Sequence, residues 1–481
     1  MRIFIAGLLA WLSLGAHAAG MGYDDARHLL SRTGFTPREE EVQAYARLTR
    51  AQAVDKLLAE TRTTAQTPAP DWVNEPFVPR RKFKDLSAEE KKALQRQQFQ
   101  RGVALRGWWY QEMLSTPTPL TEHMTLFWHN HFVSSQQKVK SAQMMYRQNV
   151  LLRQYALGNF GDLLHAVAKD PAMLLYLDNA TNRKGEPNEN FAREVMELFT
   201  LGMGNYTEQD VKEAARAFTG WSLDRDSGEF RFYPRLHDQG IKTVLGHSGN
   251  FDGDAVLDIL LAQPQTAEFI TAKLWREFVS PNPDTQEVKR LAKIFRDNHY
   301  EMKPLLRALF TSDAFYAKKN RAALIKSPVE LLVGTLRQFG IEGLDTRVLV
   351  FAGRQLNQDV FGPPNVKGWP GGEEWINSTT LLARKQLLAR LFRAEEMPVE
   401  RPMQPTGLDM NARRAMAGQA MLAHSRFDAA RFFSAFPGSV ERQRAGVERL
   451  VLARAPEHAP SATDRIDFIR QLVLDPVYQL K

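Results

Sequence analysis

Residues 185–221 read GEPNENFAREVMELFTLGMGNYTEQDVKEAARAFTGW and carry the start and stop signals of two helices. Asn188 is placed to cap the first helix, because its side chain can accept from the free amide groups of the first turn. Gly202 ends that helix. Thr207 and Asp210 have the spacing of a capping box at the start of the second. The stretch therefore predicts a pair of helices in a mainly α-helical protein.

Apolar residues recur in both predicted helices with the spacing of one helix face. We expect this face to lie against a core. The residues that form it are Phe191, Val195 and Leu198 in the first helix, and Val211, Ala214, Ala215 and Phe218 in the second.

The other face of the first helix is polar. Asn190, Glu194 and Glu197 are spaced i, i+4 and i+7, so they line one side, and Arg193 lies next to them. One interpretation is a solvated face with Arg193 pairing along the surface. The other is the wall of a polar pocket in which one carboxylate is shielded and its pKa raised. Spacing alone leaves both open.

The composition is that of a globular protein of 481 residues, with 43 % hydrophobic and 25 % charged residues. This length allows either two or three domains or one large helical body. The absence of cysteine excludes disulfides, thiolate catalysis and cysteine metal sites. The net charge of +8 favours anionic surfaces or polysaccharides, and no nucleic-acid-binding motif is present.

The N-terminus has the pattern of an export signal. Arg2 precedes an apolar run over residues 3–14, and Ala16-His17-Ala18 fits the small-x-small cleavage rule. We therefore expect a cleaved signal peptide at residues 1–19 and a periplasmic or secreted protein, with no transmembrane segment. The remaining chain is divided into a main helical domain, 20–392, and a C-terminal helical extension, 393–481.

Two histidines lie close together in the predicted helix that contains Phe127-Trp-His-Asn-His-Phe132. On a helix, residues i and i+2 point roughly 200° apart, so His129 and His131 are poorly placed to bind one ion together. We expect one of them to face the site and the other to be packed or hydrogen-bonded.

The segments on either side of residues 185–221 add further polar candidates. Asp178 lies in a loop that leads directly into the stretch. Residues 229–233 and 240–245 have the alternation of short strands, which predicts a small β-hairpin insert near 229–246. His237 lies between them, either reaching the site or serving as a turn residue.

Residues 361–377, rich in proline and glycine, predict a rigid loop that displays Asn365, Lys367, Trp369 and Trp375. Tryptophan rings on such a loop can form a platform for a sugar ring. Alternatively, both rings fill the edge of a core.

Taken together, these motifs resemble the exported bacterial family catalogued only as "domain of unknown function 1800". The resemblance covers roughly residues 23–392. It implies a mostly helical, exported protein, and an alkaline-phosphatase-like exported protein as a partner, because such proteins are often encoded beside family members. No established activity or cofactor comes with it. The motifs that carry it are Ala26–Phe35, Phe127–Phe132, Tyr176–Asn179, Pro187–Glu194, Glu197–Gly202, Phe218–Trp221, His237–Asp238, Lys273–Trp275 and Pro363–Trp369.

Three functions fit the sequence. The first is a hydrolase or lyase acting on a cell-envelope glycan, with Glu194 as general acid, Glu197 or Asp178 as the second carboxylate, and His129 or His131 as an alternative base. Substrate would be oriented by the polar and aromatic residues Asn188, Asn190, Arg193, His237, Asn365, Lys367 and Trp369.

The second function is the binding of a divalent metal by the histidines and glutamates, although no HExxH spacing supports it. The third is a scaffold or assembly partner without catalysis, in which the polar motifs are buried networks that fix the fold. A convergence of the polar motifs on one open cavity would favour the enzyme.

Overall fold

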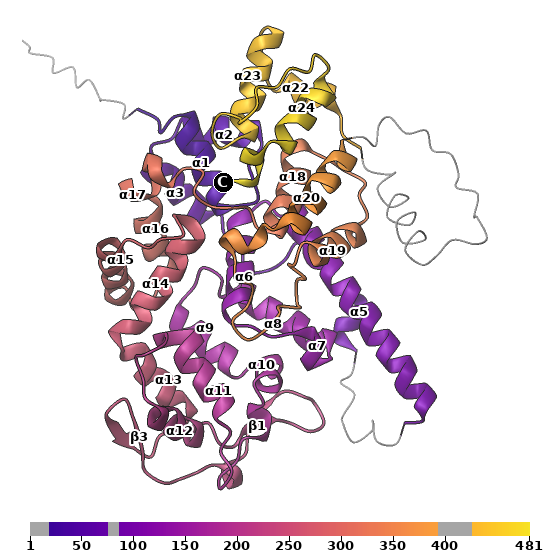
Figure 1. Ribbon diagram of the computed structural model, residues 1–481. Coiled ribbons are helices and arrows are strands. Elements are labelled where there is room, and N and C mark those ends of the chain that lie inside the picture. The colour runs from indigo at the N-terminus through magenta and orange to yellow at the C-terminus, as the bar shows by residue number, and fades with distance from the viewer. Residues whose placement is uncertain (1–18, 76–85, 393–425) are drawn as a thin grey trace, which may run out of the picture.

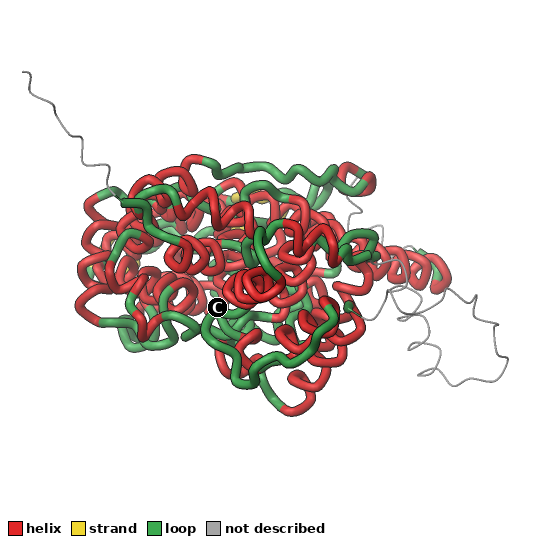
Figure 2. The backbone as a smooth tube through the Cα atoms, turned by 90° about the horizontal axis from the view of Figure 1, so that it is seen from above, coloured by secondary structure: helices red, strands yellow, loops and turns green. Residues whose placement is uncertain are grey.

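The computed structural model describes residues 19–75, 86–392 and 426–481 (Figure 1). The predicted signal peptide, apart from residue 19, lies outside these residues. The described chain is mainly helical with two small antiparallel sheets, which confirms the predicted fold class. Seen from above, helices and the loops that join them make up almost the whole backbone (Figure 2).

The N-terminal helices lead into one long helix, α5, that projects from the body (Figure 1). Ser87 and Glu90 form a capping box at its start, because each side chain accepts from the other's backbone amide. The second half of α5 buries Trp108, Trp109 and Met113 in the core. The elements are α1 (Tyr23–Thr33), α2 (Glu39–Ala46), α3 (Arg50–Ala59), η1 (Asp71–Asn74) and α5 (Ala88–Ser115).

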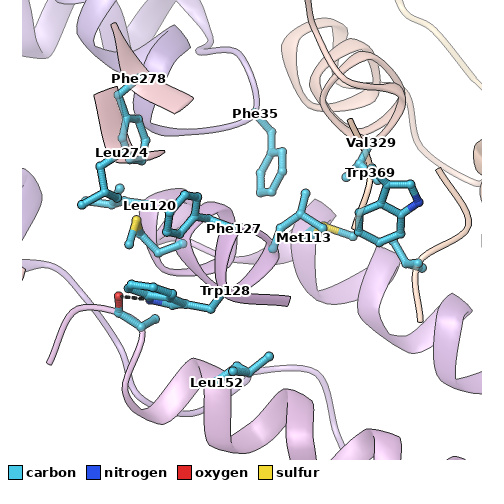
Figure 3. Packing of buried hydrophobic residues seen from close by; sticks show 14 of the residues in the cluster. Phe35, Met113, Leu120, Phe127, Trp128, Leu152, Leu274, Phe278, Val329 and Trp369 are labelled. Carbon is cyan, nitrogen blue, oxygen red and sulfur yellow. Dashed lines mark hydrogen bonds between the residues drawn. The ribbon is translucent and has the colours of Figure 1, made fainter. Parts of the chain in front are cut away.

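The next helices surround α6, which is buried along nearly its whole length. The elements are α6 (Pro119–His131), α7 (Gln136–Val139), α8 (Ala142–Gln154), α9 (Phe160–Ala168), α10 (Pro171–Tyr176) and η2 (Asn179–Thr181). Trp128 of α6 lies at the centre of the packing in Figure 3. Its ring stacks near Phe132 and Phe160, and its Nε1–H donates to the Ala156 carbonyl at 2.9 Å.

The two helices predicted in residues 185–221 are present. They are α11 (Glu189–Glu194), which continues as the π-helix η3 (Val195–Leu201), and α12 (Glu208–Ala217). Asn188 caps the first by accepting from the Asn190 amide at 3.0 Å, and the predicted capping box opens the second.

The π-helix changes which residues face the core. A π-helix bonds i to i+5, so each turn holds more residues than an α-helix. Phe199 is buried in this segment, whereas Leu198, expected in the core, is only half-buried. Phe191 and Val195 are fully buried, as predicted.

Two strands form where the sequence predicted them, but they do not pair with each other. Strand β2 (Phe230–Phe232) pairs with β1 (Trp221–Leu223), and β3 (Lys242–Val244) pairs with β4 (His247–Gly249). The short helix η4 (Pro234–Leu236) lies between the two hairpins. Local closure explains the difference, because the two-residue turn Leu245-Gly246, with both φ angles positive, closes β3 onto β4.

The following helices run back along the body to the loop that precedes α20 (Figure 1). Among the described residues, no helix is both long and apolar enough to cross a membrane. The elements are α13 (Gly253–Ala262), α14 (Pro264–Phe278), α15 (Thr285–Asp297), α16 (Met302–Phe310), α17 (Asp313–Tyr316), η5 (Lys318–Asn320), α18 (Pro328–Phe339), α19 (Thr346–Gln355), η6 (Gly372–Trp375) and α20 (Ser378–Leu391).

The C-terminal part packs onto this body. Its elements are α22 (Ala429–Ser434), α23 (Val440–Val451), α24 (Arg465–Leu474) and η7 (Pro476–Gln479). Helix α24 lies against α20, and Leu480 forms a β-bridge with Ile325. The apolar side chains of this part belong to the same hydrophobic core as those of the preceding helices.

Candidate functional site

The polar face of α11 remains partly accessible. Asn190, Glu194 and Glu197 are all half-buried. The Asn190 amide donates to the Leu177 carbonyl at 3.2 Å and approaches Asp178 Oδ2 at 3.5 Å. The loop that holds Asp178 therefore lies against this face, as the sequence order predicted.

Glu194 has the electrostatic environment of a proton donor. Burial raises its pKa first, and the neighbouring Glu197 carboxylate raises it further. Arg193 and Lys367 act in the opposite direction without cancelling the rise. Burial, with a contribution from Glu194, also raises the pKa of the Tyr176 phenol. The raised pKa of one carboxyl is the feature that the second interpretation requires, whereas Arg193 pairs along the surface as in the first.

Glu197 lies in the π-helix and is the second carboxylate of this face. The Tyr206 hydroxyl donates a short hydrogen bond to its Oε2. Burial and this bond raise the pKa of Tyr206 to about 12, so the phenol keeps its proton. Sequence reasoning did not select Tyr206, although it follows Gly202 closely in the stretch that organises the site.

Lys273 and His131 contact the other side of the π-helix. Lys273 Nζ donates to the Leu198 carbonyl at 3.4 Å and to His131 Nδ1 at 2.9 Å. His131 Nε2–H donates in turn to the Phe199 carbonyl at 3.2 Å. These bonds satisfy two carbonyl groups of the π-helix η3. Helices of this type are rare and are found frequently at functional sites.

The charge states of this pair follow from its burial. Burial, and then Arg276, lower the pKa of Lys273 to about 8. Burial and the Lys273 ammonium hold the pKa of His131 well below its usual value. His131 is therefore neutral, and both of its nitrogens have protein partners. It supports the π-helix from inside and does not face solvent.

His129 is also enclosed. Its ring packs against Trp109, Phe361 and Trp369. Its Nε2 accepts from the Phe361 amide at 3.1 Å, and burial lowers its pKa to about 3. The expectation that one of the two histidines faces the site is therefore wrong, because α6 is surrounded on all sides by packed helices and the 361–377 loop.

The 361–377 loop is held by Asn130, which sequence reasoning missed. The Asn130 side chain accepts from the Trp369 amide at 2.7 Å and donates to the Trp369 carbonyl at 3.3 Å. Gly368 has a φ of 81°, and a Cβ there would come within 2.2 Å of Asn130 Oδ1, so only glycine fits. This clamp fixes the direction of the loop.

The clamp buries the tryptophans and exposes the polar tip of the loop. Trp369 is 3 % exposed and Trp375 is also buried, so the alternative in which both fill a core edge is the one observed. Asn365 and Lys367 are exposed, and Asn365 Oδ1 accepts from the Lys367 amide at 2.9 Å. The loop thus presents Lys367, whose charge acts on Glu194, and no tryptophan platform.

The other predicted polar residues form ion pairs around α11. Asp178 binds the Lys138 ammonium at 2.8 Å. Arg193 binds Glu208 at 2.7 Å and Glu189 at 3.2 Å. These contacts tie α7, α11 and α12 together at the rim of the polar face.

His237 lies in a separate open hollow. It is 8 % exposed, and its Nδ1 lies 2.9 Å from the Thr219 carbonyl oxygen. The hollow has a volume of about 510 Å³ and is lined by Lys184, Gly185, Pro234, Arg235, His237, Asp238 and Gln239. Its lining includes none of the α11 carboxylates, so the predicted motifs do not all meet in one cavity.

One group of residues in the described part of the chain has the spacing of metal ligands. His123, Glu277 and Glu330 come from three helices, and their ligand atoms lie within 4.8 Å of one another. His123 is already paired with Glu277 at 2.7 Å, and Lys481 with Glu330. Because the Lys481 ammonium already supplies a positive charge there, we assign no metal to this group. It contains none of the histidines and glutamates considered as ligands from the sequence.

The fold and this site define a helical protein with two half-buried carboxylates on the polar face of α11 and the π-helix η3. The chain belongs to the family described as "Protein of unknown function (DUF1800)", whose sequence model matches residues 28–479. The match extends beyond residue 392, the expected end of the resemblance, and takes in the C-terminal helices. No curated protein and no solved structure matches the chain.

Proposed function

We propose that the protein is an exported hydrolase or lyase that acts on a cell-envelope glycan at the polar face of α11 and η3. Glu194 is the general acid, and Glu197 is the second carboxylate. The single observation that carries this proposal is the raised pKa of Glu194, a half-buried carboxyl next to a second carboxylate. A carboxyl whose pKa is raised holds its proton more tightly and is better suited to protonate a leaving oxygen.

The positions of the two carboxylates support a role as a catalytic pair. Glu194 and Glu197 lie three residues apart across the junction of α11 and η3, and the Glu197 carboxylate raises the pKa of Glu194. Glycosidases likewise use two carboxyl groups that flank the scissile bond. Glu197 accepts a hydrogen bond from the Tyr206 hydroxyl, whereas Glu194 is half-buried and burial raises its pKa. Two carboxyl groups can act as general acid and nucleophile only if their environments differ.

The surrounding polar groups support the binding of a polar polymer. Asn190 and Lys367 flank the carboxylates, and both have side chains within reach of solvent. A net charge of +8 adds long-range attraction for an anionic chain. Export is part of the proposal and rests on the signal pattern of residues 1–19, since an envelope glycan is encountered only outside the cytoplasm.

The test is Glu194→Gln in the mature protein, with purified envelope glycan as substrate and release of reducing ends or unsaturated products as the measurement. We expect the rate to fall about 10²–10⁴-fold, the usual contribution of a general acid. Glu448→Gln, a half-buried glutamate on α23 at the other end of the molecule, is the matched control and should keep the full rate. A Glu194→Gln protein as active as the wild type would contradict the assignment.

The second candidate is a non-catalytic scaffold for an exported alkaline-phosphatase-like partner. It is favoured by the burial of both histidines, by the pairing of both His131 nitrogens and by the bond from the Phe361 amide to His129 Nε2, which make these motifs structural. In the same assay it predicts no glycan cleavage by the wild-type protein, together with co-elution of the purified partner in size-exclusion chromatography.

A further inference from the structure

The hollow around His237 is built from two chain segments that are joined to each other. One wall is the turn at Lys184 and Gly185, before α11, and the other is η4 with the residues that follow it. The Lys184 amide donates to the Leu236 carbonyl at 2.8 Å. This backbone hydrogen bond joins the two walls of the hollow. Its volume of about 510 Å³ is in the range of small-molecule sites.

The charge of the lining is positive. Lys184 and Arg235 are exposed at its rim. Its one carboxylate, Asp238, binds the Arg216 guanidinium through both oxygens, at 2.8 and 3.2 Å. This fork holds the pKa of Asp238 at about 2, so its negative charge is permanently matched. Lys184 and Arg235 are left as the cations available to a ligand.

The hydrogen-bonding state of His237 follows from its partner. A carbonyl oxygen only accepts, so His237 Nδ1 carries the proton that goes to Thr219. In the neutral ring, Nε2 is then an acceptor, and no hydrogen bond to it is observed within the described residues. The Phe232 ring, 5.5 Å away and nearly perpendicular, fixes the imidazole in this orientation. The hollow therefore offers two cations and, in the neutral imidazole, one acceptor.

We propose that this hollow binds an acidic sugar residue, with its carboxylate at Lys184 and Arg235 and one of its hydroxyl groups donating to His237 Nε2. A simple carboxylate such as acetate would satisfy the cations but bring no donor to the imidazole, and a neutral sugar would do the reverse. A uronic acid carries both groups. The inference rests on the proposed function in one respect, because it names the class of glycan, one that contains uronate residues.

The test is isothermal titration of D-glucuronate into the mature protein, compared with glucose, acetate and inorganic phosphate. We expect glucuronate to bind at least tenfold more tightly than the other three, with an affinity that falls as salt is added. The double variant Lys184→Ala/Arg235→Ala changes only exposed side chains, and it should lose at least tenfold in affinity. Lys289→Ala, an exposed lysine on α15, is the control and should bind like the wild type.

His237→Phe tests the acceptor and should bring glucuronate binding down to the level of acetate, with circular dichroism as the check on folding. Equal binding of glucuronate and phosphate, or undiminished binding in the double variant, would overturn the proposal. Glu194→Gln should bind glucuronate normally. The glucuronate titration therefore tests the proposed binding hollow, whereas the glycan-cleavage assay tests the proposed function, and the two can fail separately.

Discussion

Arg153→Met is expected to lower the free energy of unfolding by about 3–5 kcal/mol, the usual cost of leaving one partner of a buried ion pair alone. Arg153 and Glu122 are each 1 % exposed, and Nε and Nη2 donate to the carboxylate at 2.5 and 2.9 Å. The Trp109 indole donates to the same carboxylate at 2.9 Å. Chemical denaturation of the wild type and the variant measures the loss.

The double variant Arg153→Met/Glu122→Leu separates two contributions to the lost stability. One is the loss of the ion pair, and the other is the cost of leaving the Glu122 charge buried without a partner. Removing both charges should restore much of the stability, because an apolar pair carries no desolvation penalty. The Trp109 indole then lacks an acceptor, which leaves a residual cost of about 1–3 kcal/mol. A single variant within 1 kcal/mol of the wild type would show that the pair is hydrated and not buried as described.

Asp170→Asn is expected to change how stability depends on pH. Asp170 caps α10 by accepting from Met173 N–H at 2.9 Å, and it also accepts from the Gln148 amide at 2.8 Å. Burial raises its pKa from 3.8 to about 7. The folded state therefore binds this proton more tightly than the unfolded state, and the stability it contributes, full below pH 3.8, is lost as the pH rises through 7.

Asparagine keeps the cap and does not titrate in this range. Between about pH 4.5 and 8, the unfolding free energy of the variant should therefore rise relative to the wild type by about 3 kcal/mol. Other titrating groups are common to both proteins and cancel in the difference. Parallel pH profiles for the two proteins would mean that Asp170 is ionised in the folded state across the whole range.

The helices were predictable from the sequence because their signals are local. Asn188 and the Thr207–Asp210 pair bond to amides two or three residues away, so their capping role can be predicted without knowledge of the rest of the chain. Burial, the main cause of the raised pKa of Glu194, depends on the tertiary fold, and only the smaller contribution of Glu197, three residues away, was accessible from the sequence.

The π-helix and the enclosure of the histidines depend on distant partners. Lys273 is 142 residues from His131 and 75 from Leu198, and no spacing rule connects them. The sequence of η3 has ordinary α-helical periodicity, so the π-helix could not be predicted from it. The same holds for His129, whose partner Phe361 is 232 residues away.

The tryptophan loop shows a second limit of sequence reasoning. Its glycines and prolines predicted a rigid loop, but they did not predict its direction, which depends on the two hydrogen bonds between Asn130 and Trp369. The one clue in the sequence was Gly368, because glycine is required where another chain segment comes too close to leave room for a Cβ atom. Trp369 consequently turns into the core, and Lys367 is left to face Glu194.

The central claim is that the carboxyl of Glu194 holds its proton at a pH where ordinary carboxyls have lost theirs. It is tested most directly by ¹³C NMR titration of the glutamate side-chain carboxyls in the mature protein, assigned with Glu194→Gln. We predict that Glu194 titrates above a glutamate in a short unstructured peptide, and that Glu197→Gln lowers its pKa. A Glu194 that titrates like the peptide, with or without Glu197, would contradict the account.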